Sequence, residues 1–167
     1  MDLSQRKLHR LKNYDYSQNG AYFVTICTYT RLHLFGRIDN EKIILNNAGK
    51  MTFDKFSEIS EFYPDIIINK FIVMPNHLHA ILLIQHTGTA QGPFPTMTLS
   101  DYIHRFKTLT TKLYIDGVRN GDCPKFDKKV WQKSYHDHII RNEQEYQKIW
   151  AYIDTNPLKW QEDKYFA

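Results

Sequence analysis

The chain has 167 residues, of which 42% are hydrophobic and 24% charged, and a formal net charge of +4. This profile is typical of a soluble globular protein, and we expect one domain over residues 1–167. Cys27 and Cys123 match no zinc or disulfide pattern, and the sequence has neither a visible signal peptide nor a membrane-length apolar run. We therefore expect a cytoplasmic protein without a membrane partner; the charge permits an anionic partner without requiring one.

The first 16 residues form a polar and basic segment. Its cations include Arg6, Lys7, Arg10 and Lys12. Such a segment is either an arm that follows the phosphates of a nucleic acid or a frayed, solvated terminus, and the sequence favours neither.

The next segments predict a strand, a possible hairpin and a helix. Residues 20–32 are rich in β-branched and aromatic side chains and predict a strand. Residues 37–45 predict a second strand or a hairpin extension. Either Asn46 or Asn47 then caps a helix that continues to about Phe62, because its apolar positions follow helical spacing.

Residues 65–84 are the most apolar part of the chain and predict two strands separated by a turn at Pro75-Asn76. His77 and His79 open the second strand, where side chains two residues apart point to the same face. Two neighbouring imidazoles can bind a metal ion. The alternative is that one histidine packs in the core while the other caps the turn, and the spacing alone leaves both open.

A helix is predicted after Thr98, which is a suitable N-cap with an acidic residue in the first turn. Its polar face carries Arg105, Lys107 and Lys112, which either face solvent or line a nucleic-acid groove. Residues 116–130 contain glycine, proline and many charges, and predict a linker before the C-terminal block.

The last predicted helix begins at Asn142, where Glu145 completes a pattern resembling a capping box, and ends near Thr155. Tyr146 lies on its apolar stripe, whereas Tyr152 lies off that stripe and shares a face with Asn156 one turn later. Tyr152 is therefore either a partly exposed surface tyrosine or a functional one.

Three blocks of the sequence together resemble a known family. They are Gly-Ala-Tyr-Phe-Val-Thr-Ile-Cys-Thr (20–28), Val-Met-Pro-Asn-His-Leu-His (73–79) and Tyr-Ile-Asp-Thr-Asn-Pro-Leu-Lys-Trp (152–160). In this order they resemble the single-tyrosine HUH transposases, and most closely the REP-associated tyrosine transposases. The resemblance implies an α+β, ferredoxin-like sandwich with a central antiparallel sheet and helices on one face.

The resemblance also implies roles for individual residues. His77, His79 and Asn156 match the family's metal ligands, although the insertion-sequence branch has Gln where this chain has Asn156. Tyr152 matches the nucleophile, which would cut single-stranded or hairpin DNA and form a 5′-phosphotyrosine with help from Mg²⁺ or Mn²⁺. Lys148, one turn earlier, is a candidate to assist it. Both monomers and homodimers that exchange the tyrosine helix occur in the family.

Two other patterns in the sequence compete with this interpretation. His136 and His138 form a second His-x-His, but they lie among polar residues and outside the family motif. A histidine-triad hydrolase would require a third alternating histidine, and the chain has Ile81 at that position. Two alternative functions remain: a domesticated protein that binds DNA hairpins without cutting, and an unrelated metal-dependent phosphoesterase.

Overall fold

The computed structural model describes residue 15 and residues 18–86 and 97–166. The predicted basic arm, with Arg6, Lys7, Arg10 and Lys12, lies outside these residues. In chain order the elements are β1 (Gly20–Cys27), β2 (Gly36–Asp39), β3 (Lys42–Leu45), α1 (Asn47–Ile59), β4 (Ile66–Met74), β5 (His77–Ile84), α2 (Leu99–Asn120), β6 (His136–Ile140) and α3 (Glu143–Thr155). Short 3-10 turns lie at Tyr29–Arg31, Ser60–Phe62 and Trp160–Glu162.

Four strands form the central sheet in the order β4-β5-β1-β6, and every neighbouring pair is antiparallel. Apart from the hairpin β2–β3, the chain follows the order β1-α1-β4-β5-α2-β6, which is the β-α-β-β-α-β pattern of ferredoxin-like folds. The predicted α+β sandwich with a central antiparallel sheet is therefore confirmed.

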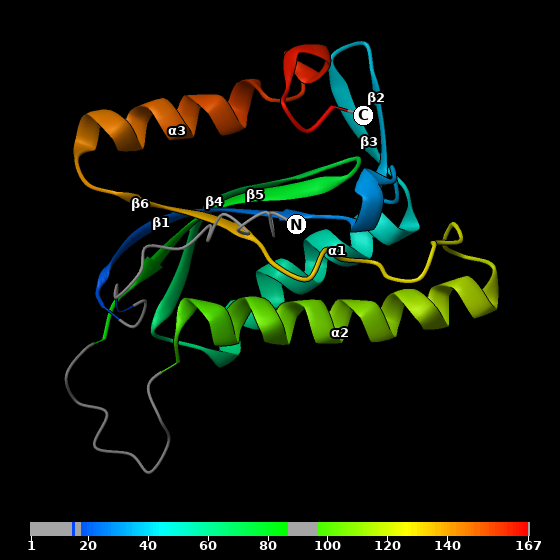
Figure 1. The fold of residues 1–167 in the computed structure, drawn as a ribbon, viewed down its shortest axis with the longest axis horizontal. Coiled ribbons are helices and arrows are strands. Elements are labelled where there is room, and N and C mark those ends of the chain that lie inside the picture. The colour runs from blue at the N-terminus through cyan, green and yellow to red at the C-terminus, as the bar shows by residue number, and fades with distance from the viewer. Residues whose placement is uncertain (1–14, 16–17, 87–96, 167) are drawn as a thin grey trace, which may run out of the picture.

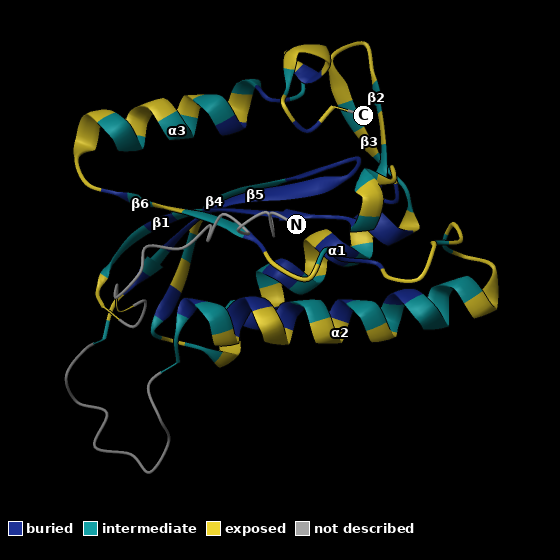
Figure 2. Cartoon of the chain, viewed as in Figure 1, coloured by how far each residue is buried: buried dark blue, intermediate teal, exposed yellow. Residues whose placement is uncertain are grey.

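The helices cover both faces of this sheet (Figure 1). α1 and α2 lie on one face, as predicted, and pack on a large core that includes Tyr22, Phe56 and Leu78. α3 differs from the prediction because it lies on the opposite face, over a smaller apolar cluster centred on Ile81 and Ile153. The even-numbered residues of β5 thus face the large core, and the odd-numbered residues face the opposite side of the sheet. The strand is almost entirely buried (Figure 2).

Local side-chain chemistry sets the helix starts. The side chains of Asn46, Thr98 and Asn142 each accept a hydrogen bond from the backbone of the following turn, so all three predicted caps are confirmed. The first strand is shorter than predicted: it ends at Cys27 instead of Leu32. The chain then turns through Thr30 and Arg31, which both have positive φ angles, of 55° and 58°.

The predicted linker 116–130 starts too early, because α2 continues to Asn120. Gly117 lies inside this helix, and a Cβ there would come within 2.5 Å of the Cys123 sulfur. The glycine thus permits a close contact instead of ending the helix, whereas Gly121 ends it with a φ of +83°. The strand β6, which pairs with β1 at the sheet edge, was not predicted.

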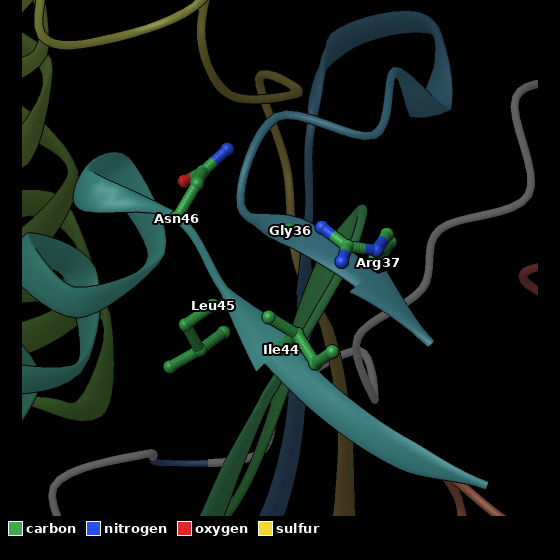
Figure 3. Close-up of a pocket in the computed structure, with 5 residues that line it drawn as sticks. All are labelled: Gly36, Arg37, Ile44, Leu45 and Asn46. Carbon is green, nitrogen blue, oxygen red and sulfur yellow. The ribbon is translucent and has the colours of Figure 1, made fainter. Parts of the chain in front are cut away.

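The hairpin β2–β3 confirms the prediction for residues 37–45 and forms a small pocket of its own (Figure 3). Gly36, Arg37, Ile44, Leu45 and Asn46 line this pocket. Gly36 has a φ of +147°, and a Cβ there would lie 2.2 Å from the Ile44 carbonyl oxygen, so the two strands approach too closely for a side chain. This pocket contains none of the predicted site residues.

Candidate metal and tyrosine site

His77 and His79 lie at the start of β5, on the face of the sheet that α3 covers. β1 pairs Cys27 with His77 and Thr25 with His79, so the histidines occupy the middle of the sheet and not its edge. Both side chains are fully buried, and their ring centroids are 4.3 Å apart. The i, i+2 spacing thus brings the two imidazoles together, as predicted from strand geometry.

Each imidazole is held from one side through its Nδ1 atom. Nδ1 of His79 is 2.8 Å from the Thr25 hydroxyl, and Nδ1 of His77 is 2.8 Å from the Asn76 amide oxygen. Within residues 18–86 and 97–166, Nε2 of His77 has no hydrogen-bond partner although it is buried. This nitrogen therefore lacks the partner that buried polar atoms normally have.

α3 brings Tyr152 and Asn156 to the same place. Ile153 anchors the helix in the smaller core, and Lys70 of β4 forms an ion pair with Asp154 and lies 4.2 Å from the Trp150 ring centre. These contacts orient the helix on the sheet of its own chain. The Tyr152 hydroxyl lies 3.3 Å from Nε2 of His79.

Asn156 lies at the end of α3 and is 2% exposed. Among the described residues its amide oxygen has no hydrogen-bond partner, like Nε2 of His77. The structure therefore gathers His77, His79, Tyr152 and Asn156 around one point, although their roles stay predictions. Lys148, the proposed assistant, is exposed.

Asp163 is the member of this group that the sequence analysis missed. Its carboxylate accepts hydrogen bonds from the Tyr152 hydroxyl, at 2.9 Å, and from the Asn156 amide. One ligand atom from each of His77, His79 and Asp163 lies within 4.8 Å of the other two, so this group could hold a metal ion. No periodic pattern marked Asp163, because it follows a 3-10 turn in the irregular C-terminal segment.

The C-terminal segment also covers the histidines. The Tyr165 ring centre is 4.8 Å from that of His77 and 5.5 Å from that of His79, and Tyr165 is itself buried. In Figure 1 this segment lies on the same side of the sheet as α3. Tyr165 thus covers the two histidines on the face of the sheet where α3 lies.

Burial controls the protonation of these groups. It lowers the pKa of His77 to about 4, against the smaller opposing effects of the Asp163 charge and the Asn156 amide. Burial also lowers the pKa of His79 well below its ordinary value, helped by His77. Burial, and next the Asp163 carboxylate, raises the pKa of Tyr152 far above its usual value. At neutral pH both imidazoles are therefore neutral and able to bind a metal.

The donor atoms of this site suit a divalent cation. A second proton on the His77 ring, at Nε2, would satisfy the Asn156 oxygen, but burial opposes the charged ring that it would create. Two unpartnered acceptors and a carboxylate thus converge where a cation would satisfy them. Imidazole nitrogen with carboxylate and amide oxygen is compatible with Mn²⁺ and, less commonly, Mg²⁺.

The competing pair His136 and His138 lies on the edge strand β6. Nε2 of His138 is 2.6 Å from the carboxylate of Glu145, which lies in the first turn of the following helix. In the described part of the chain, His77, His79 and Asp163 are the one group of three or more histidine, cysteine or carboxylate residues whose ligand atoms lie close enough for a metal ion.

The predicted DNA-binding residues of α2 lie on the other side of the sheet (Figure 1). Arg105 and Lys112 are exposed, while the Lys107 ammonium donates to the carbonyl oxygens of Gln132 and Ser134. A groove of about 680 Å³ runs between α2 and the segment 126–133. Its cationic side chains include Lys107, Lys128, Lys129 and Lys133, of which the sequence analysis identified only Lys107.

The chain has a relative that is similar to it over almost its whole length. No protein-family model matches the chain. The chain is 34% identical to an uncharacterized protein of Haemophilus influenzae (strain ATCC 51907 / DSM 11121 / KW20 / Rd), over 99% of this chain and 95% of that one. It belongs to the same protein family as that protein.

Solved structures define the class of fold. A REP-associated tyrosine transposase bound to a REP hairpin superposes with a TM-score of 0.61 at 20% identity, covering 93% of this chain and 76% of that one. A Deinococcus radiodurans R1 protein described as a candidate transposase gives 0.52 at 16% identity, covering 87% and 95%. The chain therefore has the fold of the REP-associated tyrosine transposases. No described helix is long and apolar enough to cross a membrane.

Proposed function

We propose that this protein is a metal-dependent single-strand DNA endonuclease and strand transferase that acts on hairpin-forming DNA. One observation carries the proposal: the Tyr152 hydroxyl lies 3.3 Å from Nε2 of His79, beside the possible metal-holding group completed by His77 and Asp163. A hydroxyl beside metal ligands is the arrangement that an activated oxygen nucleophile requires. The transposase fold supports the same chemistry.

His77, His79, Asn156 and Asp163 would hold Mn²⁺ or Mg²⁺. The bound ion would supply positive charge that stabilises the developing charge on the scissile phosphate. In the strand cut, the Tyr152 oxygen forms a bond to phosphorus while the bond to the 3′ oxygen breaks. The tyrosine proton passes to the Asp163 carboxylate, which already accepts it in a hydrogen bond, and the 3′ oxygen takes a proton from water and leaves as a hydroxyl.

The covalent 5′-phosphotyrosine retains the energy of the phosphodiester, so a 3′-hydroxyl can later displace Tyr152 and rejoin the strand. The high pKa of Tyr152 belongs to the metal-free protein, where burial and the Asp163 carboxylate raise it. A cation beside the oxygen opposes both effects and favours the phenolate.

We also propose that a single chain assembles its own site. Lys70 of β4 forms an ion pair with Asp154 and lies over the ring of Trp150, both in α3. Asn69, also in β4, donates a hydrogen bond to the hydroxyl of Tyr146 in α3. These contacts favour a helix that serves its own sheet. A monomer is then sufficient for cleavage, and a homodimer is not required.

The proposed substrate is a DNA hairpin, as in the neighbouring REP-associated transposase structure. The net charge of +4 is compatible with an anionic partner. Arg105, Lys107 and Lys112 of α2 and the basic residues of the N-terminal segment are proposed to contact phosphates.

The test is covalent trapping. Hairpin oligonucleotides from the DNA that flanks the gene are incubated with the protein and Mn²⁺, and adducts are mapped by mass spectrometry. We expect an adduct on Tyr152, none with Tyr152→Phe, and an undiminished adduct with Tyr146→Phe as the matched control. An adduct on Tyr146 or Tyr135, or one that Tyr152→Phe still forms, would contradict the proposal.

A second candidate function is hairpin binding without cleavage. It is favoured by the complete burial of His77 and His79 beneath Tyr165, which keeps a phosphate from the histidines unless the C-terminal segment moves. This candidate predicts tight hairpin binding with no adduct at any metal concentration. A phosphoesterase unrelated to transposition would instead hydrolyse phosphodiesters without attachment to Tyr152.

A further inference from the structure

Asn76 connects one of the two histidines to distant parts of the chain. It lies in the turn before β5 and is 1% exposed. Its main-chain oxygen accepts hydrogen bonds from the backbone N–H and the hydroxyl of Thr28, so the backbone itself holds the turn. The Asn76 side chain is therefore not needed to hold the turn and can form other hydrogen bonds.

The side-chain amide of Asn76 has only one possible orientation. Its nitrogen donates to the carbonyl oxygen of Tyr165, at 2.8 Å, and to that of Arg31, at 3.3 Å. Carbonyl oxygens only accept hydrogen bonds, so the NH₂ group must face them. The amide oxygen is left facing Nδ1 of His77, at 2.8 Å.

This orientation determines where His77 carries its proton. An amide oxygen only accepts, so Nδ1 of His77 must donate, and a neutral ring then has its lone pair on Nε2. The opposite tautomer would place two acceptors 2.8 Å apart in a buried site. Nε2 is the buried nitrogen without a hydrogen-bond partner among the described residues, on the side of Asn156 and Asp163.

His79 provides an internal contrast. Its Nδ1 faces the Thr25 hydroxyl, which can donate or accept. Its Nε2 faces the Tyr152 oxygen, whose proton is directed to Asp163, so a hydrogen bond at this contact has Nε2 as its donor. No contact of His79 therefore keeps a proton on Nδ1, whereas the Asn76 oxygen does so at His77.

We propose that Asn76 is a positioning residue that fixes His77 as the Nδ1–H tautomer and thereby keeps its Nε2 ready for a metal ion. The ordering of the ring precedes metal binding. The role as a metal ligand rests on the proposed function, whereas the tautomer can be measured without any metal. Partners of this kind typically change metal affinity by about 10–100-fold when they are removed.

The experiment measures the imidazole ¹⁵N shifts of the full chain at pH 7.5 in EDTA. In the wild type, Nδ1 of His77 should have a pyrrole-type shift and Nε2 a pyridine-type shift. Asn76→Leu, close in volume but unable to accept, should lose this uniform tautomer. Thr25→Val, the matched control, should change His79 and leave His77 unaltered.

Mn²⁺ calorimetry supplies the second readout. Asn76→Leu should bind about 10–100-fold more weakly than the wild type. Backbone N–H spectra of each variant report whether it folds, and the wild-type tautomer needs no variant. A proton on Nε2 of His77 in the wild type would overturn the inference, as would unchanged tautomer and affinity in folded Asn76→Leu. Absence of Mn²⁺ binding by the wild type would overturn the proposed function alone.

Discussion

The buried histidine pair should make the metal-free protein lose stability as the pH falls from 7.5 to 5.0. Burial lowers the pKa of His77 from 6.5 to about 4 in the folded protein, while the unfolded chain retains the ordinary value. Between these two values the unfolded state binds more protons than the folded state. The stabilising contribution is therefore complete above pH 6.5 and is lost as the pH falls toward the folded pKa.

The size of this loss follows from the two pKa values of His77. A gap of about 2.5 units corresponds to about 3 kcal/mol once both states are protonated, at 1.36 kcal/mol per unit. At pH 5.0 the folded state is still mostly neutral, so the loss is about 2 kcal/mol. His79 acts in the same direction, because burial lowers its pKa too. Such a loss is a large part of the roughly 5–15 kcal/mol by which domains are stable.

Urea unfolding in EDTA, followed by tryptophan fluorescence at pH 7.5 and 5.0, measures this effect. The comparison is between the wild type and His77→Gln, which removes the titrating group and keeps a polar side chain. We expect the wild type to lose about 2 kcal/mol more than the variant over this interval. Equal pH dependence of the two proteins would refute a neutral, buried His77.

Three other outcomes can be measured. Mn²⁺ at a hundredfold excess over its Kd should stabilise the wild type by about 2.7 kcal/mol in urea titrations, and Asp163→Asn should reduce that gain at the same Mn²⁺ concentration; an equal gain would remove Asp163 from the site. Ile153→Ala should lose about 2–5 kcal/mol on unfolding and half-buried Ile149→Ala less, and equal losses would contradict the anchoring role of Ile153. Hairpin affinity should fall with salt, and Lys128→Ala should lower the logarithmic slope by about 1; an unchanged slope would exclude a phosphate contact there.

The sequence predicts the parts of this fold that local patterns encode. The apolar run around residues 65–84 was a reliable signal for two strands, and Asn46, Thr98 and Asn142 marked helix starts because each supplies a side-chain acceptor. Strand geometry placed His77 and His79 on one face, and the resemblance pointed to α3 as the source of Tyr152.

The features that the sequence does not predict depend on tertiary contacts. β6 is a five-residue edge strand that starts with His-Asp-His, and pairing with β1 stabilises it despite its polar start. Gly117 lies inside α2, where the Cys123 side chain occupies the space that a Cβ would fill, so this glycine does not mark the helix end. Asp163 and Tyr165 reach the site only because the chain folds back after α3. No periodic pattern of residues in the sequence predicts this change of direction.

The cost of the unpartnered atoms distinguishes a metal site from an ordinary polar core. Nε2 of His77 and the Asn156 oxygen are buried acceptors without hydrogen bonds among the described residues, and each such atom typically costs about 1–3 kcal/mol. A core selected only for stability would replace them with apolar side chains of similar volume, as it does at Ile81 on the same strand face. Asn76 adds to the cost, because it keeps a proton on Nδ1 and so prevents a neutral His77 from donating through Nε2 to the Asn156 oxygen. A divalent cation satisfies both acceptors and the Asp163 carboxylate together, whereas a proton on the buried ring is opposed by the low pKa of His77. We therefore interpret the free-energy cost of these unpartnered atoms as a cost that the binding of a metal ion would offset.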